Sequence, residues 1–310
     1  MIPTITNNTY QKSFKGNLSP LDLKYKKALI KGIQETYQFT PKLENMDSIL
    51  APGELKTFLK LLPQKAFNVG KRSDDLFSST SEFKNVKKGK FQINLHLHTR
   101  HSDGSMSVED FLDQSARYAD KVAQNKDVNG IPFYISSITD HNDFEGSKEA
   151  VAAIVEDPKK YKNFKFIPGC EFLFLDNNCG FIFSSFEAVG LGFNPFDKEL
   201  LSKLCNFNEI SIIDKIKEFG GILSYAHPLR FCQGNGMDID FIKYLKRIGI
   251  DGIESNYQYL NFKNTPELKN EIKRSKEIAH NFDLWETGGT DTHSRNIFHS
   301  RAGKILDKLI

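Results

Sequence analysis

The segment that decides the fold is Asn94–Gly104, NLHLHTRHSDG, which ends a predicted strand. His96 and His98 lie two positions apart in this segment, and Asp103 follows shortly after them. Side chains at positions i and i+2 of a strand point to the same face, so the two imidazoles can lie side by side at the strand end. Two such imidazoles either ligate one metal ion or face solvent from a half-buried strand, and this motif alone does not decide between the two.

The composition is that of a folded protein without a strongly charged surface. Hydrophobic residues make up 39% of the 310 residues and charged residues 26%, a globular balance rather than a disordered one. A net charge of +3 does not by itself indicate a nucleic-acid partner. Four cysteines without CxxC spacing predict free thiols in a reducing compartment. Because we find neither a signal-peptide core nor an apolar run of about 18 residues, we expect a soluble, cytoplasmic protein without a membrane partner.

The sequence of residues 1–90 predicts a helical extension followed by a connector. Ser19 and Pro20 are typical of a helix start, and the spacing of apolar residues predicts a second helix over Pro52–Leu62. Residues 68–90 are polar and contain several lysines, as a connector would. The extension either covers one side of the following domain or contacts another subunit, and the sequence leaves the oligomeric state open.

From Phe91 onward, predicted strands alternate with predicted helices. This alternation predicts parallel strands joined by helical crossovers, and therefore an α/β domain over residues 91–310. The strands are expected within 91–98, 133–139, 164–172, 181–192, 222–227, 250–255 and 284–293.

Histidine and carboxylate side chains gather at the carboxyl ends of these predicted strands. Five of the eight histidines lie there, and His280 and His299 lie elsewhere as expected surface or packing residues. In a (β/α) barrel those ends converge on one mouth, where active sites are built. The residues at strand ends are His96, His98, His141, Glu171, His227, Asp291 and His293.

Five short motifs in this order resemble the PHP (polymerase and histidinol phosphatase) family. They are HLHTRHSDG from His96, TDHND from Thr139, GCEF from Gly169, AHP from Ala226 and GTDTH from Gly289. The resemblance covers roughly residues 91–300 and leaves the extension outside it. It implies a distorted (β/α)7 TIM-like barrel, a centre of two or three divalent ions (Mn, Fe or Zn), and hydrolysis of phosphate esters.

The resemblance also implies how the ligands are shared. A first ion would be held by His96, His98, Glu171 and Asp291, and another by Asp103, His141 and His293. Glu171 would bridge to a further ion whose ligands include His227. Glu187 stands where the family pattern has a histidine, and a carboxylate can either replace that ligand or leave the position weak or empty. The number of ions therefore stays open between two and three.

The ligand types favour the same chemistry without the family name. Mixed imidazole and carboxylate ligands suit Mn²⁺, Fe²⁺ or Zn²⁺, whereas structural zinc favours cysteine. A bridging carboxylate brings two ions close together, and the water between them loses a proton near neutral pH. Together with the resemblance, this implies a metal-dependent phosphoesterase that hydrolyses a small phosphorylated metabolite or nucleotide by a metal-bridged hydroxide. No serine or cysteine nucleophile is then required.

Three arginines near the ligand motifs are candidates for binding the substrate. Arg230 lies three residues after His227, and its guanidinium can fork onto a phosphate or pair with a local acid on the surface. Arg100 and Arg295 flank other ligand motifs and are weaker candidates.

Three further polar residues lie beside the ligands. His101 is a candidate catalytic proton donor to the leaving group, or else a hydrogen-bonding partner of a ligand. Asp140 and Asn142 flank His141, and we expect them to orient its loop.

Two other functions compete with this one. A nucleic-acid end could be the substrate, as in a trimming exonuclease, because the connector residues 84–90 are basic and the net charge is positive. A non-catalytic barrel is the second alternative, in which the metal site is structural or regulatory and residues 1–90 bind a partner.

Overall fold

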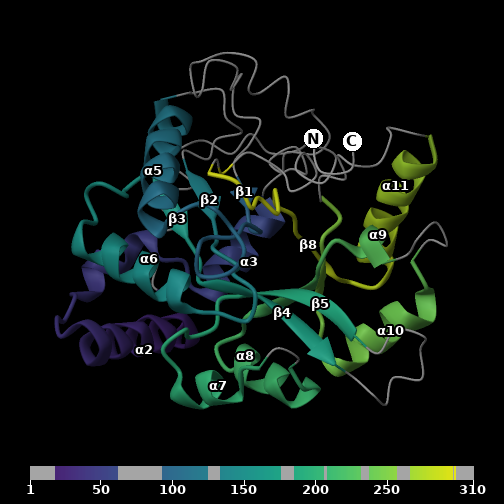
Figure 1. Ribbon diagram of the computed structural model, residues 1–310, viewed down its shortest axis with the longest axis horizontal. Coiled ribbons are helices and arrows are strands. Elements are labelled where there is room, and N and C mark those ends of the chain that lie inside the picture. The colour runs from purple at the N-terminus through teal and green to yellow at the C-terminus, as the bar shows by residue number, and fades with distance from the viewer. Residues whose placement is uncertain are drawn as a thin grey trace.

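The computed structural model describes residues 18–61, 93–124, 133–175, 185–205, 208–231, 237–256, 266–295 and 297 (Figure 1). Its helices are α2 (Pro20–Tyr37), η1 (Leu43–Ser48), α3 (Pro52–Leu61), α5 (Val108–Gln124), α6 (Glu145–Glu156), α7 (Lys198–Lys203), η3 (Ile210–Ile212), α8 (Ile213–Lys217), α9 (Pro228–Phe231), α10 (Ile239–Ile248) and α11 (Pro266–Asn281). Its strands are β1 (Ile93–Asn94), β2 (Tyr134–Ser136), β3 (Phe164–Phe166), β4 (Gly169–Leu175), β5 (Ser185–Leu191), β6 (Ile222–Tyr225), β7 (Gly252–Ile253) and β8 (Trp285–Glu286). The fold is therefore mixed α/β, as the sequence predicts.

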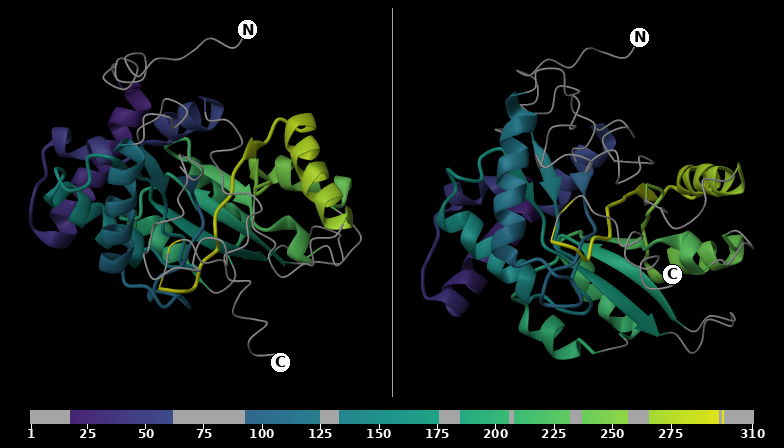
Figure 2. Two further views of the ribbon diagram at one scale, coloured as in Figure 1. Left: turned by 90° about the horizontal axis from the view of Figure 1, so that it is seen from above. Right: turned by 45° about the horizontal axis from the view of Figure 1, so that its top comes forward.

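The described strands form two sheets with helices on opposite sides of them. The first sheet has the order β1-β2-β3 and is parallel throughout. The second has the order β4-β5-β6-β7-β8 and is parallel only from β6 to β8. Helices α5 and α6 lie beside the first sheet, whereas α10 and α11 lie at the far side of the second (Figures 1 and 2).

The prediction of parallel crossovers throughout is wrong for β5. This strand runs antiparallel to both neighbours, with Leu175 opposite Ser185 and Gly169 opposite Leu191. The physical reason is the connection: only residues 176–184 separate β4 from β5, and a parallel crossover needs a dozen or more residues. The described strands form no closed barrel, so the structure shows the α/β class but not the predicted TIM-like closure.

Backbone hydrogen bonds join the two sheets at the ends that carry the candidate ligands. The Asp291 amide donates to the His96 carbonyl at 2.8 Å, which connects the segment after β8 to the segment after β1. On the other side, the Asn142 amide donates to the Glu171 carbonyl at 3.0 Å. Residues far apart in the sequence are thereby held in register around one point.

Helices α2 and η1 pack into the main hydrophobic core, whereas Leu55 and Phe58 of α3 pack into a separate apolar cluster. The predicted start of α2 is confirmed, because Ser19 Oγ accepts a hydrogen bond from the Asp22 amide at 3.1 Å. Tyr25 and Leu29 of α2 are fully buried in the same apolar cluster as Phe111 of α5. Helix α2 thus shares one apolar cluster with α5. Residues 1–17 and most of the predicted connector lie outside the described residues.

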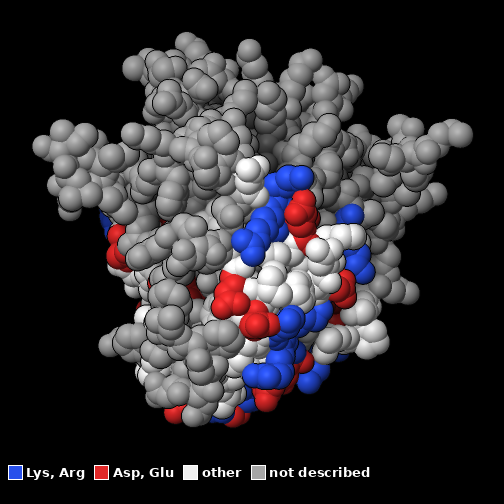
Figure 3. Space-filling view, turned by 90° about the vertical axis from the view of Figure 1, so that its right-hand side faces the viewer, with Lys and Arg blue, Asp and Glu red and all other residues white. Residues whose placement is uncertain are grey.

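Charges of both signs share the molecular face on the right-hand side of Figure 1. Figure 3 shows lysine and arginine side chains interleaved there with aspartate and glutamate. Helices α10 and α11 also contain internal ion pairs, Lys243 with Asp240 at 2.8 Å and Lys273 with Glu277 at 3.4 Å. In the described ranges, no helix has both the length and the apolar character needed to cross a bilayer.

Candidate metal centre

The predicted ligands come together where the two sheets meet. They are His96 and His98 after β1, Asp103 in the loop that follows, His141 after β2, Glu171 in β4, Glu187 in β5, His227 after β6, and Asp291 and His293 after β8. The prediction that Glu171 ends a strand is wrong, because the predicted strand 164–172 is divided into β3 and β4 and Glu171 is the third residue of β4. Glu187 lies near the start of its strand rather than the end. Because β5 runs in the opposite direction, its start lies where the neighbouring strands finish.

The first ligand set has the spacing of a tetrahedral metal site. The Nε2 atoms of His96 and His98 lie 3.2 Å apart. Glu171 Oε2 lies 3.2 and 3.3 Å from these two nitrogens, and Asp291 Oδ1 lies 3.5 and 3.2 Å from them. Donor atoms bound to a tetrahedral ion such as zinc are about 3.3 Å apart. All four side chains are fully buried, so their donor atoms fit a single ion that is shielded from solvent.

One buried oxygen in this set also indicates a cation. Glu171 Oε2 faces Nε2 of His96, Nε2 of His98 and Nδ1 of His141 at 3.2 to 3.3 Å. Despite these distances, no hydrogen bond from a described residue reaches it in acceptable geometry. A buried carboxylate oxygen requires a compensating positive charge, which a divalent ion at this point would supply.

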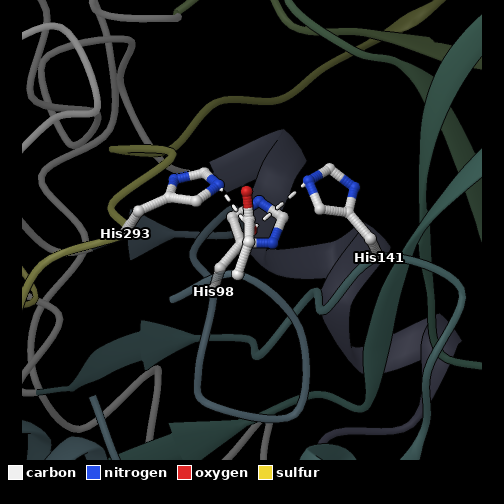
Figure 4. A group of neighbouring side chains, drawn as sticks. His98, His141 and His293 are labelled. Atoms are coloured by element: carbon white, nitrogen blue, oxygen red, sulfur yellow. Dashed lines mark ion pairs between the residues drawn. The ribbon is translucent and has the colours of Figure 1, made fainter. Parts of the chain in front are cut away.

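The second ligand set lies toward the solvent. Asp103 Oδ1 lies 2.9 Å from His293 Nε2 and 3.6 Å from His141 Nε2, and Asp103 is about half exposed. Figure 4 shows His98, His141 and His293 turned toward one another from three segments of the chain. The ring of His98 stacks on those of His141 and His293, with centroids 4.4 and 4.2 Å away. His98 thus lies within reach of this set as well as of the first, which the sequence did not predict, but its Nε2 can bind one ion only and its Nδ1 lies 3.5 Å from the Ser102 hydroxyl.

The third ligand set contains two carboxylates and one imidazole. His227 Nε2 lies 2.8 Å from Glu171 Oε1 and 3.2 Å from Glu187 Oε2. The two oxygens of Glu171 thus face different sets, as a bridging carboxylate would. Glu187 is in place to act as a ligand at the position where the family pattern has a histidine.

A buried glutamate supports the centre although the sequence analysis did not select it. Both carboxylate oxygens of Glu254 lie within 3.1 to 3.2 Å of His96 Nδ1, and Oε2 also accepts a hydrogen bond from the His227 amide at 2.8 Å. Glu254 follows β7, in the segment predicted as a strand from its IDGIES sequence. The sequence could have identified Glu254 by its position at the end of a predicted strand, which is also where the predicted ligands lie.

The centre attracts positive charge strongly. Burial lowers the pKa of His96, but the carboxylates of Glu171, Glu254 and Asp291 outweigh burial and raise that pKa well above its usual value. For His98, burial is likewise outweighed by Asp291 and Glu171, which raise its pKa to about 9. Burial raises the pKa of Glu171, yet the neighbouring imidazoles, His96 foremost, hold it well below the ordinary value. Protons on the histidines therefore balance the carboxylates when no metal is bound.

Two residues of the solvent-facing set, Asp103 and His141, have the protonation states of metal ligands near pH 7. Burial, assisted by positive charge on His98, lowers the pKa of His141 to about 4, although Glu171 opposes this shift. Burial raises the pKa of Asp103, but His293, His98 and His141 outweigh it and hold that pKa well below its usual range. Near pH 7 the imidazole of His141 is neutral and the carboxylate of Asp103 is ionised, which are the forms that bind metal.

Asp140 fixes the loop that carries the first ligands. Its carboxylate accepts hydrogen bonds from the Thr99 amide and hydroxyl, both at 2.6 Å, and from the Ser102 hydroxyl at 2.7 Å. These contacts tie the loop after His98 to the residue before His141, as expected of an orienting residue. Such support keeps ligands in place before any ion binds.

The substrate-side candidates lie outside the three ligand sets. His101 Nε2 lies 3.2 Å from the Glu149 carboxylate of α6. Arg100 is exposed and donates from Nε to the Ser105 carbonyl at 3.2 Å. Arg295 is also exposed, and the side chain of Arg230 lies outside the described residues.

Comparison with known proteins finds solved structures with a distantly similar backbone fold, and two of them are described below. No family model matches the sequence, and no curated protein matches it. One similar solved structure is a protein of Bifidobacterium adolescentis assigned as a metal-dependent phosphoesterase, with 16% identity, a TM-score of 0.48, and coverage of 66% of this chain and 88% of that chain. The other is an amidohydrolase from Chromobacterium violaceum with bound sulfate and no metal, with 17% identity, a TM-score of 0.47, and coverage of 67% and 90%. The candidate site is assigned from the side chains described above and not from these similarities.

Proposed function

We propose that this protein is a metal-dependent phosphoesterase of the PHP type. One observation carries the proposal: in a fully buried site, five of the six distances among the donor atoms of His96, His98, Glu171 and Asp291 are 3.2 to 3.5 Å, close to the edge lengths of a metal tetrahedron. Two further ligand sets adjoin this one: the third set shares Glu171 with it, and the second set shares His98. Three adjoining sets favour two or three ions rather than one.

The residues present fit first-row divalent ions. The two sets with two or more imidazoles suit Zn²⁺, Fe²⁺ or Mn²⁺, and the set of Glu171, Glu187 and His227, in which carboxylates outnumber imidazoles, suits Mn²⁺ best. When bound, such ions lower the pKa of water at the centre and neutralise charge on a phosphoryl group. Glu171 would hold two ions through its two oxygens. Asp103 is the most exposed ligand, so we propose that the substrate phosphate approaches from its side.

We propose further that the two sheets belong to one distorted (β/α)7 barrel spanning residues 91–310. The hydrogen bonds from Asp291 to His96 and from Asn142 to Glu171 support this, because they link the sheets on both sides of the ligand centre. The substrate that we propose is a small phosphorylated molecule in the cytoplasm. The mixed charges in Figure 3 give no support to a nucleic-acid surface on that face.

The experiment is a hydrolysis assay with an aryl phosphate and a bis-aryl phosphate, each with Mn²⁺, Fe²⁺ or Zn²⁺. We expect hydrolysis by the parent protein, and a loss exceeding about 100-fold in His98→Ala and Asp291→Ala, because both remove a ligand rather than its supporting residue. His280→Ala is the matched control, since His280 is an exposed histidine of α11. Unchanged activity in both ligand variants would exclude the proposed centre, as would a parent protein that binds no divalent metal.

A further inference from the structure

Glu254 faces the imidazole of His96 from the side opposite to the ligand cluster. Its oxygens lie 3.1 and 3.2 Å from Nδ1, whereas Nε2 of the same ring lies 3.2 Å from Glu171 Oε2. The two ring nitrogens point in different directions, so Glu254 cannot share an ion with Nε2 of His96. Its carboxylate is 1% exposed, and a buried charge of this kind is retained only where it has partners.

This contact determines which nitrogen of His96 is available to a metal. A carboxylate at Nδ1 accepts the proton of the neutral ring there, which leaves the lone pair on Nε2. Histidines that bind metals usually donate their other N–H to a carboxylate or carbonyl, which fixes the ring and makes the ligand more basic. The geometry at His96 has this arrangement.

The same carboxylate also holds the backbone of a second ligand. Glu254 Oε2 accepts a hydrogen bond from the His227 amide at 2.8 Å. His227 has a φ of 28°, an unfavourable backbone conformation for a residue with a Cβ atom, so surrounding contacts must maintain it. In this conformation its Nε2 lies 2.8 Å from Glu171 Oε1. Glu254 therefore connects a ligand of the first set to a ligand of the third.

We propose that Glu254 is a positioning residue that orients His96 and His227 together and so couples metal binding at the first and third ligand sets. This inference rests on the proposed function, because it requires the centre to bind metal. An ion held by Asp103, His141 and His293 is the internal reference, since the described side-chain contacts of Glu254 reach His96 and His227.

The test is a titration of the metal-free full chain with Co²⁺, monitored by the visible absorption of the bound ion. Competition with a chelator then gives the affinities. Glu254→Ala should weaken Co²⁺ binding about 10- to 100-fold for the ions of the first and third sets, while one further ion keeps its parent affinity. Glu254→Gln retains an oxygen that can accept from the His227 amide but loses the charge at His96. It should therefore lie between the parent and Glu254→Ala, with an altered Co²⁺ spectrum.

The matched control is Glu286→Gln, which changes a carboxylate on the neighbouring strand β8 that accepts from the Ser255 hydroxyl at 2.7 Å. It should bind Co²⁺ like the parent. A merely structural role for Glu254 would lower the melting temperature but leave the affinity and spectrum unchanged, and that result would overturn the inference. If Glu254→Ala fails to fold, the glutamine variant decides by the same criteria.

Failure of this inference can be distinguished from failure of the proposed function. A parent that binds Co²⁺ and hydrolyses an aryl phosphate, together with Glu254 variants that bind within twofold of it, would refute only the role of Glu254. A parent that binds no Co²⁺ would refute the metal centre, and the positioning role with it.

Discussion

Single side chains serve more than one ligand set in this centre. The ring of His98 lies 3.2 Å from Asp291 and stacks on His293, and the two oxygens of Glu171 face opposite directions. Loss of Glu171 should therefore affect two ions at once. The raised pKa of His98 shows that such a residue also holds a proton in the absence of metal.

Metal binding should consequently be sensitive to pH. The pKa of His98 is raised to about 9 from an ordinary value near 6.5, so its protonated form stabilises the metal-free fold at low pH, and this stabilisation is lost as the pH rises through 9. A metal requires the neutral ring and must displace the proton. We expect the apparent affinity for Zn²⁺ to rise between about pH 6.5 and 9, with proton release measurable by calorimetry in buffers of different ionisation enthalpy. An affinity independent of pH across that interval would contradict this.

Sequence reasoning identified the ligands at the residue scale better than it identified their support. His141 and Asp291 were predicted because each follows a predicted strand, and the structure brings them to one centre. Glu254 also lies at the end of a predicted strand. A position at a strand end does not distinguish a metal ligand from a carboxylate that supports a ligand. The double role of His98 was also missed, because it depends on distances between loops that no spacing in the sequence determines.

At the scale of elements, helix α2 joins the extension to the α/β domain. Leu29 lies on its buried face within the main apolar cluster, whereas Leu21 on the same helix is 43% exposed. The start of this helix was predictable from Ser19 and Pro20. Its packing partners were not, because amphipathic spacing shows that a face is buried but not which element covers it.

Truncating these two leucines should therefore have different effects on stability. Leu29→Ala should lower the free energy of unfolding by about 2–5 kcal/mol, because it leaves a cavity in the core. Leu21→Ala, the matched control, should change it by less than about 0.5 kcal/mol. Denaturant unfolding followed by circular dichroism measures both. Equally small effects would mean that α2 is not part of the cooperative fold.

At the scale of the whole molecule, ligands from both sheets lie around one centre. Residues as distant in sequence as His96 and Asp291 supply donor atoms to one set, and the backbone bond between them links the two sheets. Any ion held there would cross-link segments that are far apart in the chain. Folding and metal binding should therefore be thermodynamically linked.

Removal of metal should accordingly lower thermal stability. At a free metal concentration about 1,000 times the dissociation constant, binding adds about 4 kcal/mol, which corresponds to a rise of roughly 5–10 °C in melting temperature. The shift should disappear on chelation and be largely absent in Asp291→Ala, while His280→Ala keeps it. Scanning calorimetry with and without chelator measures it, and equal melting temperatures for the parent protein in both conditions would count against a resident ion.

The antiparallel pairing of β5 with β4 also fixes the distance between two carboxylates of the centre. Glu171 lies opposite Val189 and Leu173 lies opposite Glu187, so Glu171 and Glu187 occupy diagonal positions on one face of a hairpin. Their separation depends on strand pairing and not on the length of the 176–184 connection. Natural variants could lengthen that connection freely, whereas a slip of one residue in pairing would turn Glu187 to the other face and leave His227 with one acidic neighbour instead of two.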